Sequence, residues 1–261
     1  MAQHHNEYVL GRGKVYLALE TSFDAFDTVG ERYTGNSPGH VLNIESQSLD
    51  HFNSDGGINE LDASVVTQVN RSGTLTLDSI DTDNLTMFFL GTKAVISQVA
   101  TPVVGEVIEN VLPGLYFQLG ASLSNPQGVR GVSALTITNG GSPATTYVAG
   151  EDYELDAEAG RIYVVPGGDI PAGGDLTIGY TPVASTRDRV ISGSKPQRGR
   201  LRYIEDNPAG TNRTFLMPLV ELSPNGDFDL KGDTWRQIPF NLKVLKRGSL
   251  AALYIDGVPQ V

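Results

Sequence analysis

The chain has 261 residues, with 19 basic and 30 acidic side chains, so its formal charge is 19 − 30 = −11 and a protein that grips nucleic acid is disfavoured. It contains no cysteine, which excludes disulfides, Cys-based zinc sites, iron–sulfur clusters and thiol nucleophiles. Hydrophobic residues make up 39% of the sequence, and 30 glycines and 14 prolines imply many turns, so we expect a turn-rich β protein.

The first predicted strand is 14–19, which alternates and is rich in β-branched and aromatic residues. Residues before it resemble a loose arm, and 20–40 lack sustained periodicity, which indicates a long irregular loop. A second strand is expected at 41–49. There Leu42 and Ile44 share one face and polar side chains share the other, as in a sheet with one dry and one wet side.

A polar, Gly-broken segment, 51–62, follows this strand. It is too irregular for a tight two-residue hairpin, so we expect it to project from the body as a loop. The next stretches, 63–69 and 71–78, alternate again, with Leu75 and Leu77 opposite a row of Ser, Thr and Asp residues. These strands also predict one wet face.

One helix is expected after these strands. Asp81 or Thr82 can cap its N-terminus, Asp83 suits the positive end of its dipole, and Gly91 should end it. Its apolar residues fall at i, i+3 and i+4: Leu85, Phe88 and Phe89.

A second body of sequence is predicted between about 121 and 184, where short strands alternate with Gly/Pro turns. Strand-like pieces at 95–99, 107–111 and 115–119 precede a Gly/Ser/Pro-rich passage, 122–131, that marks the boundary. We therefore expect a small β insert within a discontinuous host domain.

The host domain resumes with strands at 200–205 and 215–222. The longest period-two signal, 235–245, predicts a central core strand that contains Trp235, the one tryptophan. Its inward positions alternate: Ile238, Phe240, Leu242 and Val244.

Charge is distributed unevenly along the chain. Residues 1–119 carry 5 basic and 15 acidic side chains (−10), 120–182 carry 2 and 7 (−5), and 183–261 carry 12 and 8 (+4). Chance clustering on solvated faces explains this pattern, and so does contact between acidic and basic patches of neighbouring copies.

No constellation of residues indicates catalysis. Two of the four histidines, His4 and His5, lie in the N-terminal arm, and no zinc set can be assembled. Phosphate-binding glycine loops and the common hydrolase motifs are absent. Helix-terminal acidity and turn chemistry explain the two acidic clusters better than a calcium site does: Asp78, Asp81 and Asp83, and Asp227, Asp229 and Asp233.

We expect no enzyme activity, no cofactor and no metal. Without a leader peptide or a membrane-length apolar run, we also expect a soluble protein that folds in a reducing cytoplasm.

Several short motifs are spread over 33–120 and 198–246, about half of the chain. They are YTGNSP (33–38), LNIES (42–46), LDHFNSDGGI (49–58), DASV (62–65), NRSG (70–73), DNLTMFFLG (83–91), PGLYFQLG (113–120), EDNPAG (205–210) and LSPNGDF (222–228), the last with Trp235 downstream. Together they resemble the major tail tube proteins of long, flexible-tailed bacteriophages.

The resemblance implies a mainly β fold: a tail-tube β-sandwich or barrel with one flanking helix, formed by 1–120 and 185–261. The insert 121–184 resembles the Ig-like domains that such proteins carry on the outer surface. The family assembles as hexameric rings that stack, and the genome leaves the capsid through their lumen. The implied partners are the chain itself and the terminator, tape measure and distal tail proteins, in a virion tail assembled in the host cytoplasm, with no membrane partner.

Two surfaces follow from combining this role with the strand pattern. A conduit must pass DNA without binding it, so we expect the lumen to carry negative or neutral polar groups. The lumen-facing candidates are Asn43, Glu45, Gln47, Ser72, Thr74, Thr76 and Asp78. The loop expected to contact the next ring consists of His51, Phe52, Asn53, Ser54, Asp55, Gly56, Gly57, Ile58, Asn59, Glu60, Leu61 and Asp62.

A carbohydrate-binding or adhesive β-sandwich of a secreted or periplasmic kind is the alternative, because an Ig-like insert suits that class equally well. The lack of a signal sequence and of an aromatic platform counts against it.

Overall fold

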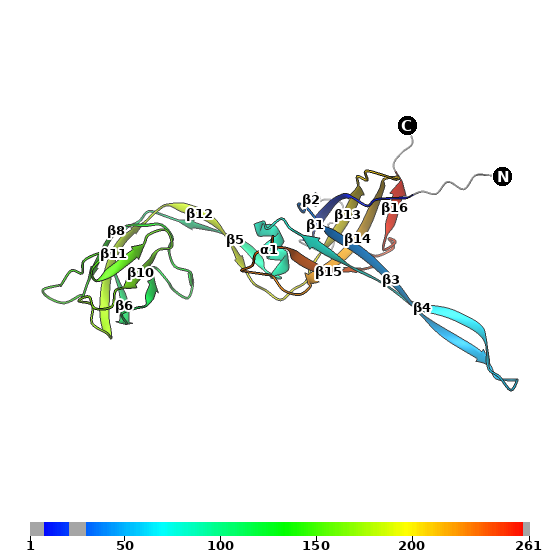
Figure 1. Cartoon of the computed structure of the whole chain (residues 1–261), viewed down its shortest axis with the longest axis horizontal. Coiled ribbons are helices and arrows are strands. Elements are labelled where there is room, and N and C mark those ends of the chain that lie inside the picture. The colour runs from blue at the N-terminus through cyan, green and yellow to red at the C-terminus, as the bar shows by residue number, and fades with distance from the viewer. Residues whose placement is uncertain (1–7, 21–29, 258–261) are drawn as a thin grey trace. The chain divides into compact units, whose positions relative to one another are not determined.

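The computed structural model describes residues 8–20 and 30–257, and this part of the chain is mainly β with one short helix (Figure 1). The β class expected from composition and alternation is therefore confirmed. The chain divides into two compact units. Unit 1 consists of Met1–Ala94 and Arg189–Val261, and unit 2 is Val95–Asp188. Each unit has a hydrophobic core of its own. The predicted N-terminal arm with His4 and His5, and most of the predicted loop 20–40, lie outside the described residues.

Unit 1 is built on one eight-stranded antiparallel sheet. Its strands are β1 (Gly13–Leu19), β2 (Arg32–Tyr33), β3 (Gly39–Asn53), β4 (Glu60–Leu77), β13 (Gln197–Glu205), β14 (Arg213–Pro224), β15 (Ile238–Val244) and β16 (Tyr254–Gly257). Their order is β2-β1-β13-β14-β15-β4-β3, and β16 also pairs with β14. Strands from both ends of the chain thus interleave, which makes the discontinuous unit a single folding body.

The core of unit 1 lies on one face of this sheet. Alternation points the apolar side chains of the strands to that face: Val15, Leu17, Leu75, Leu77, Leu201, Met217, Val220, Leu222, Ile238, Phe240 and Leu242. Helix α1 (Thr82–Phe88) packs against β14 and β15 and adds Met87 and Phe88 to the core. The Phe88 ring meets Phe240 edge-on at 6.1 Å between centroids. The sheet therefore has one dry face and one polar face, as the alternation predicts.

The N-terminus of α1 forms where expected, because Asp81 caps it by accepting a hydrogen bond from the Asn84 backbone N–H at 2.7 Å. The fully buried Asn84 side chain then fixes the helix to the chain around it. Its Nδ2 donates to the Thr34 and Ser79 carbonyl oxygens at 2.9 Å each, and its Oδ1 accepts from Arg32 Nη2 at 2.7 Å.

Unit 2 contains two three-stranded antiparallel sheets around a second core. One sheet has the order β6 (Val103–Val111), β11 (Gly174–Pro182) and β8 (Val132–Thr138), and the other β7 (Tyr116–Gln118), β10 (Arg161–Val164) and β9 (Tyr153–Asp156). The chain passes between the units through β5 (Thr92–Gln98) and β12 (Ser185–Ile191), which pair as a two-stranded sheet.

Unit 2 begins earlier in the chain than the expected insert boundary at 121. β6 pairs with β11 and β7 pairs with β10, and Val111 and Leu119 are buried in the unit 2 core. The Gly/Ser/Pro-rich passage 122–131 is therefore a loop inside unit 2, because the partners of its preceding strands lie farther along the chain.

Two other expectations were wrong in detail. Trp235 lies outside β15 and is 93% exposed, although the strand itself buries Ile238, Phe240 and Leu242 as predicted. Half of the expected loop 51–62 is strand, because β3 runs to Asn53 and β4 starts at Glu60. Strand pairing therefore continues almost to the tip of a long hairpin.

Candidate assembly and conduit surfaces

The β3/β4 hairpin extends beyond the sheet as a two-stranded ribbon. β3 and β4 pair from Gly39/Thr76 to Asn53/Glu60, whereas β15 accompanies β4 only between Ser72 and Leu77. Residues 44–71, called the ribbon below, therefore have no third strand among the described residues (Figure 1). Ten residues of β3 in this part correspond to about 33 Å of strand.

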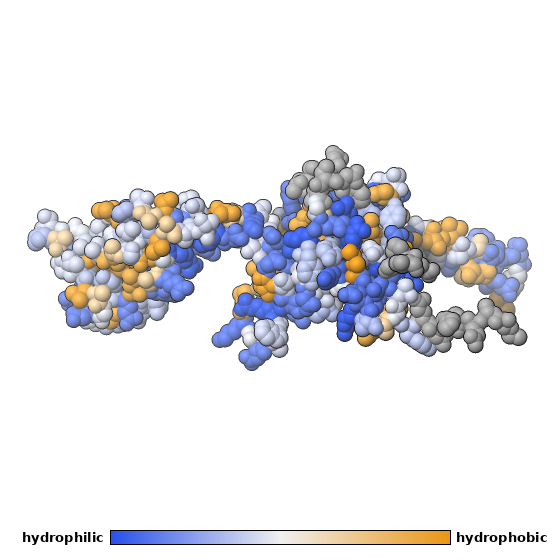
Figure 2. Space-filling model, turned by 90° about the horizontal axis from the view of Figure 1, so that it is seen from above, coloured by the Kyte–Doolittle hydropathy of each residue, from blue (hydrophilic) through white to orange (hydrophobic). Residues whose placement is uncertain are grey.

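The ribbon carries apolar side chains that are exposed to solvent: Ile44, Leu49, Phe52, Ile58, Leu61, Val65, Val66 and Val69. Figure 2 shows such residues in orange along the ribbon at the right. Alternation along β3 puts Ile44 and Phe52 on the same face as Leu42, which packs on the core. Their strand pairing adds Leu61, Val66 and Val69 to that face. The dry face of the sheet thus continues outward along the ribbon without a cover.

Two register shifts interrupt the ribbon, between Gln47 and Ser48 and between His51 and Phe52. Next to the second shift, His51 Nδ1 lies 2.5 Å from Asp62 Oδ1. Ser64 Oγ also donates to Asp50 Oδ1 at 2.6 Å across the strands. Cross-strand polar contacts therefore hold the strands together near the tip, where the expected inter-ring residues 51–62 all lie.

The seven expected lumen-facing residues all lie on or beside the polar side of β3 and β4, but in three places. Asn43 pairs with Ser72, and these two line a shallow hollow of about 490 Å³ with Thr74, Asn241 and Lys243. Thr76 lies farther along the same face, opposite Gly39. Glu45 and Gln47 belong to the ribbon instead. Asp78 follows the end of β4, where its Oδ2 accepts from Asn36 Nδ2 at 2.6 Å.

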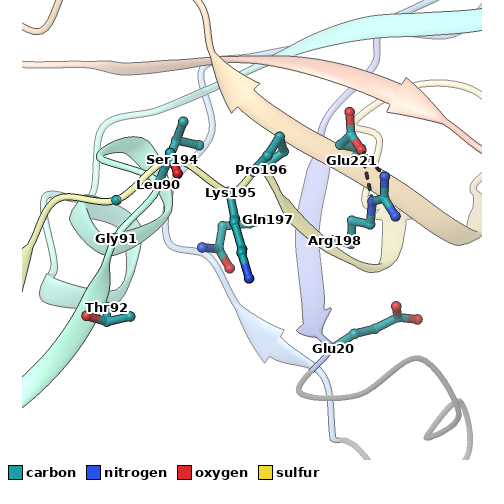
Figure 3. A pocket seen from close by; sticks show the side chains of 11 residues that line it. Glu20, Leu90, Gly91, Thr92, Ser194, Lys195, Pro196, Gln197, Arg198 and Glu221 are labelled. Atoms are coloured by element: carbon teal, nitrogen blue, oxygen red, sulfur yellow. Dashed lines mark hydrogen bonds and ion pairs between the residues drawn. The ribbon is translucent and has the colours of Figure 1, made fainter.

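The polar face also carries a row of cations that the overall charge of −11 conceals. Arg198, Arg200 and Arg202 occupy alternate positions of β13. Across the sheet, a line of directly paired residues runs from Arg198 through Glu221, Lys243 and Ser72 to Asn43. Arg198 Nε and Nη2 donate to Glu221 Oε2 at 2.9 and 2.7 Å (Figure 3), and Lys243 Nζ lies 3.9 Å from Glu221 Oε1. The face is therefore of mixed charge, unlike the negative or neutral lumen expected from the sequence.

A second carboxylate serves the other two arginines. Glu31 Oε1 lies 2.9 Å from Arg200 Nε, and its Oε2 accepts from Arg202 Nε at 2.8 Å. Glu20 and Arg247 form a further ion pair between the two ends of the chain. Acidic N-terminal and basic C-terminal segments thus meet inside one copy, which accounts for part of their complementarity without a neighbour.

An open hollow of unit 1, with a volume of about 1030 Å³, lies beside this row (Figure 3). It is lined by Glu20, Leu90, Gly91, Thr92, Gly193, Ser194, Lys195, Pro196, Gln197, Arg198 and Glu221. Gly193 N donates to Phe89 O at 3.1 Å and holds the segment against the end of α1. The charged groups that line the hollow are Glu20, Glu221, Lys195 and Arg198. They include no nucleophile paired with a general base.

The first acidic cluster has structural uses. Asp81 caps α1 and also pairs with Arg32 at 3.3 Å, and Asp83 pairs with Lys93 at 3.4 Å. In the described ranges no group of three or more His, Asp or Glu side chains is arranged to hold a metal ion. Among those same residues, no helix has the length and apolar character needed to cross a membrane.

Unit 2 presents an aromatic face that sequence reasoning missed. Tyr116 and Tyr163 are directly opposite on β7 and β10, with ring centroids 4.8 Å apart. The Arg161 guanidinium lies 5.0 Å from the Tyr116 ring centroid and pairs with Asp156 at 2.9 Å. The alternation of Arg161 and Tyr163 with the buried Ile162 and Val164 is the signal that could have revealed this face.

Comparison with known proteins places the chain in a family. A family model described as "Protein of unknown function UCP028589" matches residues 8–251, which include unit 2, the ribbon and most of unit 1. The chain belongs to this family. A search of curated proteins found no significant match. The family description gives no activity, so function has to be argued from the surfaces described above.

Proposed function

We propose that the chain is a major tail tube subunit of a long-tailed bacteriophage, which assembles into stacked hexameric rings. In this role unit 1 is the tail-tube domain, related to the sandwich or barrel of that family, and unit 2 is an Ig-like decoration on the outer surface. The partners are further copies and the terminator, tape measure and distal tail proteins. The place of action is the virion tail, after assembly in the host cytoplasm.

The observation that carries the proposal is the uncovered apolar face of the ribbon. A two-stranded ribbon is at best marginally stable alone in water, and apolar side chains such as Phe52, Val66 and Val69 gain free energy when another surface covers them. A neighbouring ring supplies such a surface at every level of a stack. Residues 51–62, at the end of the ribbon, are then the part that reaches farthest toward that neighbour.

Lateral assembly has a physical basis in the sheet edges. β3 ends the sheet on one side, and at the other side β2 pairs with only Tyr16 and Leu17 of β1. Edges with unpaired backbone groups invite pairing with another chain. Joining the β3 edge of one copy to the β1 edge of the next is a head-to-tail contact that closes into a ring. The polar faces of the sheets then line a continuous conduit.

Sedimentation over a range of protein concentrations tests this proposal. We expect a shift from single copies to a species of six copies and its multiples, without any added ligand. Deletion of residues 46–69, which removes the uncovered ribbon, should stop growth beyond the ring. A wild-type protein that sediments as a single copy at every concentration contradicts the proposal.

Glycan binding by unit 2 is a second candidate function, favoured by the Tyr116/Tyr163 face with Arg161 and Asp156 beside it. Exposed aromatic rings flanked by hydrogen-bonding side chains suit a sugar ring. A glycan array probed with the wild type and with Tyr116→Ala tests it: binding lost in the variant supports this role, and no binder at all removes it.

A further inference from the structure

The cation row on the polar face of unit 1 has a graded exposure. Arg198 and Lys243 keep 45% and 65% of their side chains exposed, whereas Glu221 between them keeps 15%. Arg202 keeps 32%, and its partner Glu31 keeps 17%. Arg200 keeps 16%, about the same as Glu31. Arg198, Lys243 and Arg202 thus reach solvent farther than the carboxylates that hold them, and Arg200 does not.

Each of the two carboxylates engages two cations, Glu221 with Arg198 and Lys243, and Glu31 with Arg200 and Arg202. The local sum is four positive and two negative charges. Successive arginines on β13 are two residues apart, about 6.6 Å along the strand, so they form a linear track rather than a point cluster. Arginine forks that are occupied by a carboxylate are not available for bidentate contact with phosphate.

We propose that this row is a latent phosphate-binding track for nucleic acid, and that Glu31 and Glu221 keep its affinity low. The ligand class is a polyanion with regularly spaced phosphates, because the row is linear and the side chains of Arg198 and Lys243 are exposed to solvent. No hydrophobic side chain lies between the arginines on the same face of β13. The affinity itself does not depend on assembly. Only its use, to let DNA move along the lumen without sticking, rests on the proposed tube function.

The structure dictates which carboxylates matter. Neutralising Glu221 removes the carboxylate that engages Arg198 and Lys243, and neutralising Glu31 removes the one that engages Arg200 and Arg202. Every cation that contacts duplex DNA adds about 0.9 to the slope of log affinity against log salt. Unit 2 supplies a matched control, because Glu109 and Glu154 are exposed glutamates outside the row. Their replacement changes the net charge by the same two units.

The experiment measures binding of fluorescent duplex DNA to unassembled protein at low concentration, over salt concentrations from about 50 to about 200 mM. The variants are E31Q/E221Q and the control E109Q/E154Q. We expect E31Q/E221Q to bind DNA at least about tenfold more tightly than the control at low salt. The slope of log affinity against log salt should be steeper by about 0.9 for each added phosphate contact, with at most four such contacts. Adding Lys243→Ala and Arg198→Ala should remove the part of this gain that comes from Glu221, about half of the added contacts.

Equal DNA binding by E31Q/E221Q and E109Q/E154Q overturns the inference. Circular dichroism accompanies each variant. If the double variant fails to fold, E221Q alone carries the test, since its cations are the more exposed pair, and it must bind DNA more tightly than E154Q. Failure to form rings would contradict the tube function and leave this result intact, whereas unchanged DNA binding would contradict the inference and leave the tube function intact.

Discussion

Replacing Phe52 by Ala on the ribbon should weaken assembly and leave the fold unchanged. Phe52 is 52% exposed in the single copy. An aromatic side chain of roughly 200 Å² therefore has about 100 Å² left to bury against a neighbour. At about 25 cal/mol per Å², the contact contributes about 2.5 kcal/mol for each copy. For the addition of one copy this corresponds to a factor of about 60 in concentration, so the concentration at which tubes form should rise by at least that factor.

Light scattering against protein concentration measures that midpoint, and urea unfolding measures stability. Two control variants separate the effects. Leu123→Ala changes a fully exposed residue of unit 2 and should alter neither quantity. Phe240→Ala empties a buried core position and should cost about 3–5 kcal/mol of folding free energy. An unchanged stacking midpoint in Phe52→Ala would refute the reasoning that a neighbour covers the ribbon.

Three further predictions follow from individual contacts. A variant lacking 53–59 should keep its circular dichroism spectrum but form shorter tubes, and tubes of wild-type length would show that the tip is not the inter-ring contact. Asn84→Leu removes the hydrogen bonds to the Thr34 and Ser79 carbonyls and the contact with Arg32, which keeps its ion pair with Asp81. It should lower the free energy of unfolding by about 2–4 kcal/mol in urea titrations; a loss below that of a surface substitution would argue against this network. Burial lowers the pKa of His40, although the Thr74 carbonyl opposes the shift, so the unfolded chain takes up the proton first and unit 1 should lose stability as the pH falls below about 6.5. His40→Phe should flatten this dependence in thermal melts at pH 5 to 8, and an equal slope in both proteins would assign it elsewhere.

Local patterns predict the parts of this fold whose structure is decided locally. The alternation of Ile238, Phe240 and Leu242 identifies a core strand because one face of a sheet is buried. Asp81 identifies the start of α1 because only a short polar side chain satisfies the first backbone N–H groups. The wet and dry faces of β3 and β4 follow from the same period of two.

Features that depend on distant partners could not be predicted in this way. The extent of unit 2 depends on β6 and β7 pairing with strands 43 to 77 residues later, which turn-rich composition does not encode. Trp235 precedes the alternating positions of the strand by an odd number of residues, and β15 starts three residues after it, so its side chain lies in solvent. The alternating arginines of β13 are visible in the sequence, but their carboxylate partners are not, because Glu31 is remote along the chain.

Self-assembly is the central claim, and electron microscopy of the purified protein at increasing concentration tests it most directly. The account predicts rings with a central hole that stack into tubes, and fewer tubes as salt rises if charged contacts between copies contribute, since such contacts are screened over roughly 8–10 Å at physiological ionic strength. Single particles without rings or tubes, at high protein concentration, in moderate salt and after long incubation, would contradict it.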